Sequence, residues 1–134
     1  MAQPVDVSAA IFAMRARVNC HCSECRRSAS AFCLSVEVRR AGLRVLTGEH
    51  AWSRSTHSGR RLKCFSCPQC GSCLSHQSDP PGERVRLNAG PLDVQVDVSP
   101  AIHIWTSRPL PGVIIPSDAR QSLHEPGDSL IEER

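Results

Sequence analysis

The chain has 134 residues and a formal net charge of +3, and hydrophobic residues make up 40% of it. This length accommodates one domain with one core. No stretch approaches the apolar length of a transmembrane helix, so we expect no membrane partner. Aromatic residues are only 4% and Tyr is absent, which leaves few large core anchors. A bound metal ion would therefore add useful stability.

The eight cysteines can form four disulfides or one or two metal sites. The first residues contain no basic segment, and the apolar run that follows is too short for a signal peptide. We therefore expect a reducing compartment, the cytoplasm, where metal binding is preferred to disulfide formation.

Charge is divided unevenly along the chain. Residues 1–63 hold eleven basic residues against four acidic ones, and residues 64–134 hold five against nine. The basic half suits a small anionic ligand or, less specifically, a nucleic acid. A solvated basic surface is the alternative. Few aromatic residues are available to stack on bases, so we do not expect nucleic acid as a partner.

In chain order, the first cysteine motif is Cys20-His21-Cys22-Ser23-Glu24-Cys25, followed by Arg26 and Arg27. Before it, residues 11–14 form a short apolar run that fits a strand or a short helix. Three thiols within six residues converge readily on one ion and leave its fourth tetrahedral position open, as in catalytic zinc sites. A helix is predicted over residues 23–30, with Ser23 as its cap.

Residues 32–38 predict a strand with Cys33, Ser35 and Glu37 on one face and apolar residues on the other. Further strands are predicted over 43–46, 52–57, 85–89 and 101–105. Together these elements indicate a mainly β domain with little helix. From Ser117 the chain is polar and charged, so residues 117–134 are expected to form a loose tail.

A second cysteine cluster, Cys64, Cys67, Cys70 and Cys73, follows about forty residues after the first. The segment Cys67-Pro68-Gln69-Cys70-Gly71 has the composition of a zinc knuckle. Pro fixes the first turn residue, and Gly71 permits a left-handed bend.

These motifs resemble the glutathione-dependent formaldehyde-activating enzyme family, which includes centromere protein V. The resemblance rests on Cys20 to Arg27, Cys67 to Ser72, Leu87-Asn88-Ala89-Gly90-Pro91-Leu92-Asp93 and His103-Ile104-Trp105, and it spans roughly residues 18–110. It implies a small two-sheet β fold, like that of a zinc-binding chaperone for Rab GTPases. We accordingly divide the chain into an atypical N-terminal segment, 1–17, a zinc domain, 18–116, and the tail, 117–134.

The resemblance also implies a catalytic Zn²⁺ on Cys20, Cys22 and Cys25 and a structural Zn²⁺ on Cys67, Cys70 and an earlier Cys-x-Cys pair. This sequence has no cysteine before Cys20. Three alternatives follow for the second site. Cys64 or Cys73 replaces the missing ligands, the knuckle holds no metal, or the start of the chain has been altered.

The implied activity is that of a carbon–sulfur lyase, which forms or cleaves the S-hydroxymethyl adduct of a thiol such as glutathione. Arg26 and Arg27 are the candidates for the substrate carboxylates, because a guanidinium pairs with a carboxylate through two hydrogen bonds. Arg54, Arg61 and Lys63 are weaker candidates. His21 is interpreted as structural, with a fourth metal ligand in the resting state as the alternative, and His103 is interpreted as a core histidine. Cys33 is interpreted as a small buried apolar residue, and Trp52 and Trp105 as core or pocket residues.

Two other functions remain open from sequence alone. The chain can be a non-catalytic zinc module for protein or nucleic-acid interaction. It can also be a degenerate family member that keeps the fold and has lost the chemistry, because a shared fold does not fix a substrate.

Overall fold

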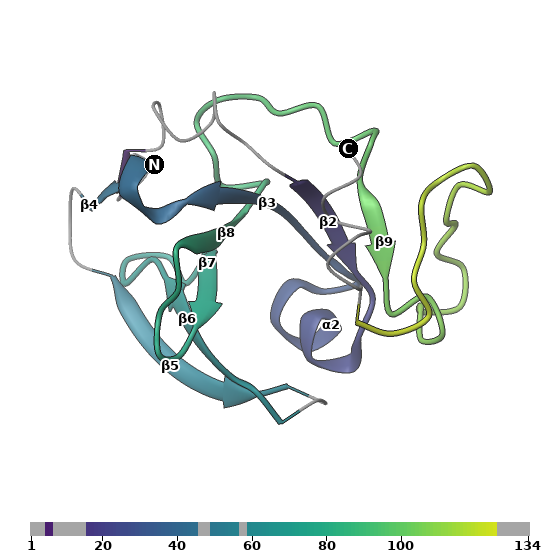
Figure 1. Ribbon diagram of the computed structural model, residues 1–134, viewed down its shortest axis with the longest axis horizontal. Coiled ribbons are helices and arrows are strands. Elements are labelled where there is room, and N and C mark those ends of the chain that lie inside the picture. Colours follow the sequence, from purple (N-terminus) through teal and green to yellow (C-terminus); the bar gives the residue numbers. More distant parts are fainter. Residues whose placement is uncertain (1–4, 7–15, 46–48, 57–58, 126–134) are drawn as a thin grey trace.

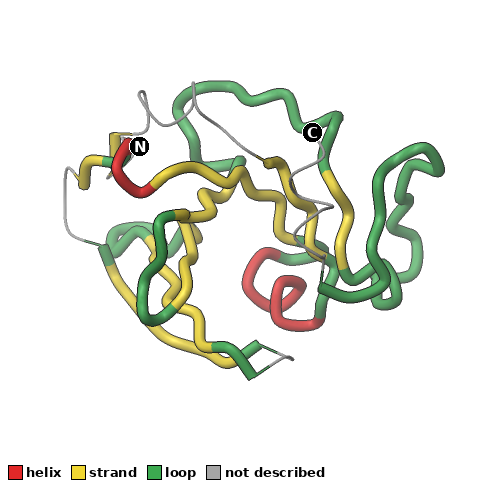
Figure 2. Tube along the Cα trace, in the orientation of Figure 1, coloured by secondary structure: helices red, strands yellow, loops and turns green. Residues whose placement is uncertain are grey.

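The computed structural model describes residues 5–6, 16–45, 49–56 and 59–125. Its strands are β1 (Val5–Asp6), β2 (Ala16–Cys20), β3 (Cys33–Arg39), β4 (Arg44–Val45), β5 (His50–Ser55), β6 (Arg61–Ser66), β7 (Cys73–Ser78), β8 (Arg84–Asn88) and β9 (Ile102–Ile104). Helix α2 (Ser23–Ala29) and a single 3-10 turn (Arg40–Gly42) are the helical elements of the described residues (Figure 2). The mainly β architecture predicted from sequence is confirmed.

Seven strands form one sheet in the order β5-β6-β7-β8-β3-β2-β9, and β1 pairs with β4 in a separate two-stranded ribbon. Neighbouring strands of the large sheet are antiparallel except β2 and β9, which are parallel. Figure 1 shows the sheet curving so that α2 lies on its inner side, between β5 and β6 at one end and β2 and β9 at the other. A curved sheet of this kind places side chains from strands far apart in sequence around one hollow.

Strand β3 shows why the sheet has two chemically different faces. Its side chains alternate as the sequence predicts. Val36 and Val38 are fully buried and pack with Val85 and Leu87 of β8 in an apolar cluster on one face. Burial of a side chain such as Leu87 contributes roughly 1.5–3 kcal/mol. Cys33, Ser35 and Glu37 point to the opposite face, which carries the polar pocket described below.

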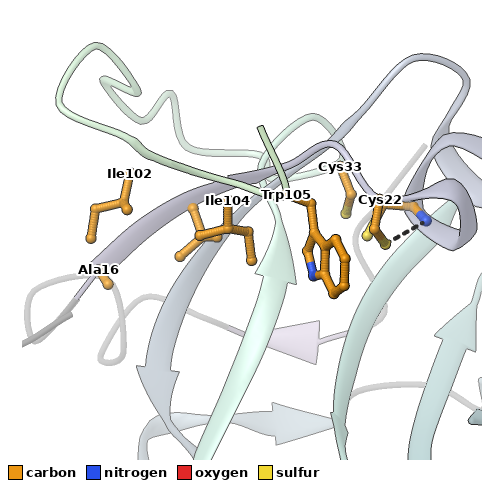
Figure 3. Close-up of a cluster of buried hydrophobic side chains, with 8 residues drawn as sticks. Ala16, Cys22, Cys33, Ile102, Ile104 and Trp105 are labelled. Atoms are coloured by element: carbon orange, nitrogen blue, oxygen red, sulfur yellow. Dashed lines mark hydrogen bonds between the residues drawn. The ribbon is translucent and has the colours of Figure 1, made fainter. Parts of the chain in front are cut away.

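A second apolar cluster joins the two strands at the β9 end of the sheet to the cysteine motif. It contains side chains from β2, α2, the start of β3, β9 and the residue after β9, namely Ala16, Val18, Cys22, Cys25, Cys33, Ile102, Ile104 and Trp105. Figure 3 shows the Trp105 ring on the same side as the Cys22 and Cys33 sulfurs. The first cysteine motif is therefore part of the core, which fixes its geometry.

Helix α2 begins one residue earlier than its expected cap implies. Cys22 takes the N-cap position, and its Sγ accepts a hydrogen bond from the Cys25 backbone N–H at 3.4 Å (Figure 3). Ser23, the predicted cap, is instead the first helical residue. The sulfur replaces the usual cap oxygen because its residue must also face the other cysteines.

Three strands of the sheet lie in segments that the sequence left without a predicted strand. Strand β2 begins at Ala16, inside the segment expected to be atypical, β6 precedes the knuckle, and β7 follows it directly. Residues 117–125, expected to begin a loose tail, bond along β9: His103 donates to the Arg120 carbonyl and accepts from the Ser122 N–H, both at 2.9 Å. The expectations for residues 11–14 and 126–134 fall outside the described residues.

None of the helices described here has the length and apolar character needed to cross a membrane. The division into segments 1–17, 18–116 and 117–134 stays a prediction.

Candidate metal centre

The sulfurs of Cys20, Cys22 and Cys25 form the group of ligand atoms predicted from the first motif. All three lie within 4.8 Å of one another. Cys20 ends β2, Cys22 caps α2, and Cys25 lies in the first turn of that helix. The strand end and the helix start thus turn the three side chains toward one point, and Cys22 and Cys25 are buried.

Mutual hydrogen bonds shift the pKa values of the three thiols in opposite directions. The Cys20 and Cys25 thiols donate to the Cys22 sulfur and lower the pKa of Cys22 to about 2. The same bond from Cys20 to Cys22 raises the pKa of Cys20 to about 12. Hydrogen bonds with Cys20 and Cys22 raise the pKa of Cys25, and burial raises it further. A divalent cation that binds all three sulfurs as thiolates would displace the remaining thiol protons.

Zinc fits this donor set. Tetrahedral sulfur ligands at a Zn–S distance of about 2.3 Å lie about 3.8 Å from each other. Three sulfurs already within 4.8 Å therefore need only small shifts to hold the ion. Soft thiolates favour Zn²⁺ over hard cations such as Mg²⁺.

A pocket of about 160 Å³ opens directly over the three sulfurs on the inner side of the curved sheet. Each of the seven strands of the large sheet contributes to its wall. The pocket lining includes Cys20, Cys22, Cys25, Cys33, Glu37, Arg54, Arg60, Leu62, His76, Arg84, Arg86, Ile104, Trp105 and Glu125. The sulfurs are thus accessible to a small ligand, as an open zinc position requires.

Four guanidinium groups line this pocket, from Arg54 on β5, Arg84 and Arg86 on β8, and Arg60 before β6. Arg60 Nη2 forms an ion pair with Glu125 Oε2 at 3.4 Å. Arg86 lies across from Glu37 in the β3–β8 ladder and across from His76 in the β7–β8 ladder. Arg54 lies opposite Leu62 in the β5–β6 ladder and so faces no carboxylate there.

The pKa of His76 is lowered by its burial and by two of these arginines. Burial lowers its pKa to about 3, and the charges of Arg86 and Arg54 act in the same direction. The imidazole is therefore neutral at physiological pH. Sequence reasoning missed His76, because the alternation of β7 around it is irregular.

Cys33 is a fourth thiol of the pocket wall, although the sequence suggested only a small apolar residue. Cys33 is buried, and its side chain forms a hydrogen bond with Cys25. This hydrogen bond lowers the pKa of Cys33, whereas burial acts to raise it. Its Sγ also lies 3.7 Å from Asn88 Oδ1. Its place on the polar face of β3, recognised in the sequence, was the signal for this role.

Cys64 and Cys73 line a second, smaller pocket that adjoins the first. Cys25, Cys33, Arg54 and His76 line both pockets. Burial raises the pKa of Cys64, while the charge of Arg54 and a hydrogen bond from it act in the opposite direction. Cys73 Sγ donates to the Ser28 carbonyl at 3.3 Å.

The knuckle forms as a turn. Gly71 has φ +77°, as predicted, and its N–H donates to the Cys67 carbonyl at 2.8 Å. Cys67 is buried, whereas Cys70 is exposed and contacts Ser72 Oγ at 3.1 Å. In the described part of the chain no second group of three close ligand atoms exists. Cys64 and Cys73 line the second pocket and do not form such a group with Cys67 and Cys70. Our proposals therefore concern one zinc ion.

The other cationic candidates lie outside the main pocket. Arg27 is exposed on α2, Arg26 is half-buried, and neither lines that pocket. Arg61 and Lys63 are exposed on β6 and do not line it either. Among the cations considered from sequence, only Arg54 does.

His21 and His103, which were interpreted separately from sequence, contact each other. His21 is fully buried, and its Nε2 lies 3.1 Å from His103 Nδ1. The two rings stack at 5.4 Å between centroids. Trp105 lines the main pocket and bonds through Nε1 to Glu125 Oε1 at 3.4 Å, whereas Trp52 lines the smaller one.

Residues 3–108 match the model of the family described as the glutathione-dependent formaldehyde-activating enzyme. The chain belongs to this family. The match covers the three-sulfur group, the knuckle and all seven strands of the large sheet. Curated protein sequences give no significant match.

A solved structure supports the fold. The crystal structure of a Rhodobacter sphaeroides protein from a structural genomics programme superposes with a TM-score of 0.51. The two sequences are 24% identical, and the alignment covers 69% of this chain and 81% of that chain. At this identity the likeness concerns the fold alone.

Proposed function

We propose that the protein is a zinc-dependent carbon–sulfur lyase that forms or cleaves the S-hydroxymethyl adduct of a small thiol such as glutathione. Cys20, Cys22 and Cys25 hold the zinc and are the catalytic residues of this proposal. The observation that carries it is the position of the three sulfurs at the base of an open pocket. Family membership supports the choice of reaction.

The reaction joins the thiol sulfur to the formaldehyde carbon. The carbonyl π bond breaks, and the thiol proton ends on the former carbonyl oxygen. When bound, zinc supplies a position that lowers the pKa of a thiol placed there. The protein's own residues hold and orient the reactants, because Ile104, Leu62 and Trp105 give the pocket an apolar wall and the arginines give it positive charge. Orientation of two reactants in this way lowers the entropic part of a barrier.

The proposed setting is the cytoplasm, where small thiols and the cysteine ligands stay reduced. The proposed partner is a small thiol, and the proposal includes neither nucleic acid nor a membrane. The roles predicted from sequence for Arg26 and Arg27 at the substrate carboxylates stay a prediction, because neither residue lines the pocket over the sulfurs.

Titration of the zinc-loaded protein with glutathione, followed by calorimetry, tests the binding step. We expect saturable binding at millimolar concentration or below, lost in Cys22→Ser. Cys73→Ser is the matched control, because a hydroxyl can still donate to the Ser28 carbonyl. Nuclear magnetic resonance with labelled formaldehyde then measures whether adduct forms faster than without protein. No binding at millimolar glutathione, or no acceleration, contradicts the proposal.

A further inference from the structure

Arg54 is the cation best placed to bind a ligand that enters over the three sulfurs. It lines both pockets and is half-buried, so its guanidinium lies inside the hollow rather than on the outer surface. Its neighbour across the β5–β6 ladder is the apolar Leu62. Arg54 itself donates a hydrogen bond to Cys64, whereas Arg60 is paired with the carboxylate of Glu125 and Arg86 has Glu37 opposite.

Cysteine sulfurs of the two pockets act on the Arg54 guanidinium. Burial acts to lower its pKa, but Cys25, Cys64 and Cys22 raise it above the ordinary value. Zn²⁺ held by three thiolates would leave a net charge of about −1 at the sulfurs. The charges of Arg86 and Arg54 also lower the pKa of His76, so their positive field reaches the pocket that an anion would enter.

The size of the pocket limits what this anion can be. Its volume of about 160 Å³ is smaller than the roughly 300–1,000 Å³ of typical ligand pockets. One short ligand arm fits between the sulfurs and the arginines, and the remainder of a tripeptide would stay outside. A guanidinium binds a carboxylate through two parallel hydrogen bonds, which suits a carboxylate at the end of such an arm.

We propose that Arg54, together with Arg86 of the same pocket wall, forms a carboxylate subsite that selects small thiols bearing an anionic group a few bonds from the sulfur. This inference rests on the proposed function, since it places the thiol sulfur at the zinc held by Cys20, Cys22 and Cys25. It assigns the substrate carboxylate to the sheet rather than to Arg26 and Arg27 of α2.

Calorimetry with 3-mercaptopropionate and its uncharged amide tests the subsite on the zinc-loaded protein. We expect the acid to bind at least about 10-fold more tightly than the amide, because hydrogen bonds to charged groups contribute about 1.5–3 kcal/mol. Arg54→Gln should remove this preference. Arg39→Gln, at an exposed arginine outside the pocket, is the control and should keep the preference.

Each other result has a definite meaning. Equal binding of acid and amide to the unaltered protein overturns the subsite and leaves the proposed function standing. No binding of either thiol overturns both. The preference for the acid over the amide can also survive in both Arg54→Gln and Arg86→Gln. If it then disappears in Arg26→Gln or Arg27→Gln, the subsite is overturned and the carboxylate binds at α2. The comparison of ligands on the unaltered protein holds even if one variant fails to fold.

Discussion

Cys33 lies directly across the β2–β3 ladder from Cys20. Directly opposed residues on antiparallel strands have Cβ atoms about 4.5–5.5 Å apart. The Cys33 side chain also forms a hydrogen bond with Cys25. It is therefore a close neighbour of the metal group, yet it does not belong to the set of sulfurs that lie within 4.8 Å of one another.

Replacing Cys33 by Ser should leave zinc content unchanged, because the three ligand sulfurs remain. Metal analysis of the purified variant checks this, with Cys20→Ser as the comparison that should lose zinc. If Cys33→Ser released the ion, Cys33 would be a fourth ligand, and the open position needed for a substrate thiol would not exist.

The His21–His103 pair should contribute measurably to stability. Replacing His103 by Leu leaves the buried His21 Nε2 without the partner that it has at 3.1 Å. An unsatisfied buried polar group costs about 1–3 kcal/mol, so the free energy of unfolding should fall by that amount in urea titrations.

The double variant His21→Phe, His103→Leu separates the pair from its packing. It removes both polar groups, so its loss of stability should be smaller than the sum of the two single losses. Strictly additive losses would mean that the contact between the two rings carries no energy of its own.

Acid should destabilise the protein through His76. Its pKa is about 3 in the folded state and 6.5 ordinarily, so the unfolded chain binds a proton that the folded chain does not. The resulting stabilisation is complete above about pH 6.5 and is lost progressively as the pH falls from there toward 3.

Comparison of His76→Gln with the unaltered protein isolates this effect, because glutamine does not titrate. With zinc saturating in both proteins, unfolding free energies are measured between pH 7.5 and 5. We expect the variant to lose less stability on acidification. Parallel curves would mean that His76 is protonated in the folded state as readily as in the unfolded one.

Local patterns in the sequence were sufficient for several parts of this structure. Alternation placed Cys33, Ser35 and Glu37 on one face of β3, and they share the pocket face. The close spacing of the first three cysteines indicated one group. Gly71 after the knuckle predicted a left-handed bend. Each of these features depends on residues near one another in the chain, which is why the sequence could reveal them.

Features that depend on pairing between distant strands could not be read in this way. Arg54, His76 and Arg86 line one pocket because β5, β7 and β8 belong to the same sheet. Cys64 and Cys73 line the second pocket, which the spacing of the four cysteines does not indicate. Residues 117–125 look polar and loose in sequence, but they gain order from backbone hydrogen bonds to β9 and beyond it, which polarity does not reveal.

X-ray absorption at the zinc edge, combined with metal analysis, addresses the three-sulfur centre directly. We expect about one zinc per chain with three protein sulfur ligands, a strong loss of zinc in Cys22→Ser, and full retention in Cys73→Ser. Zinc that stays bound in Cys22→Ser, or a protein that purifies without zinc and cannot be loaded with it, would contradict the assignment of Cys20, Cys22 and Cys25 as the metal site.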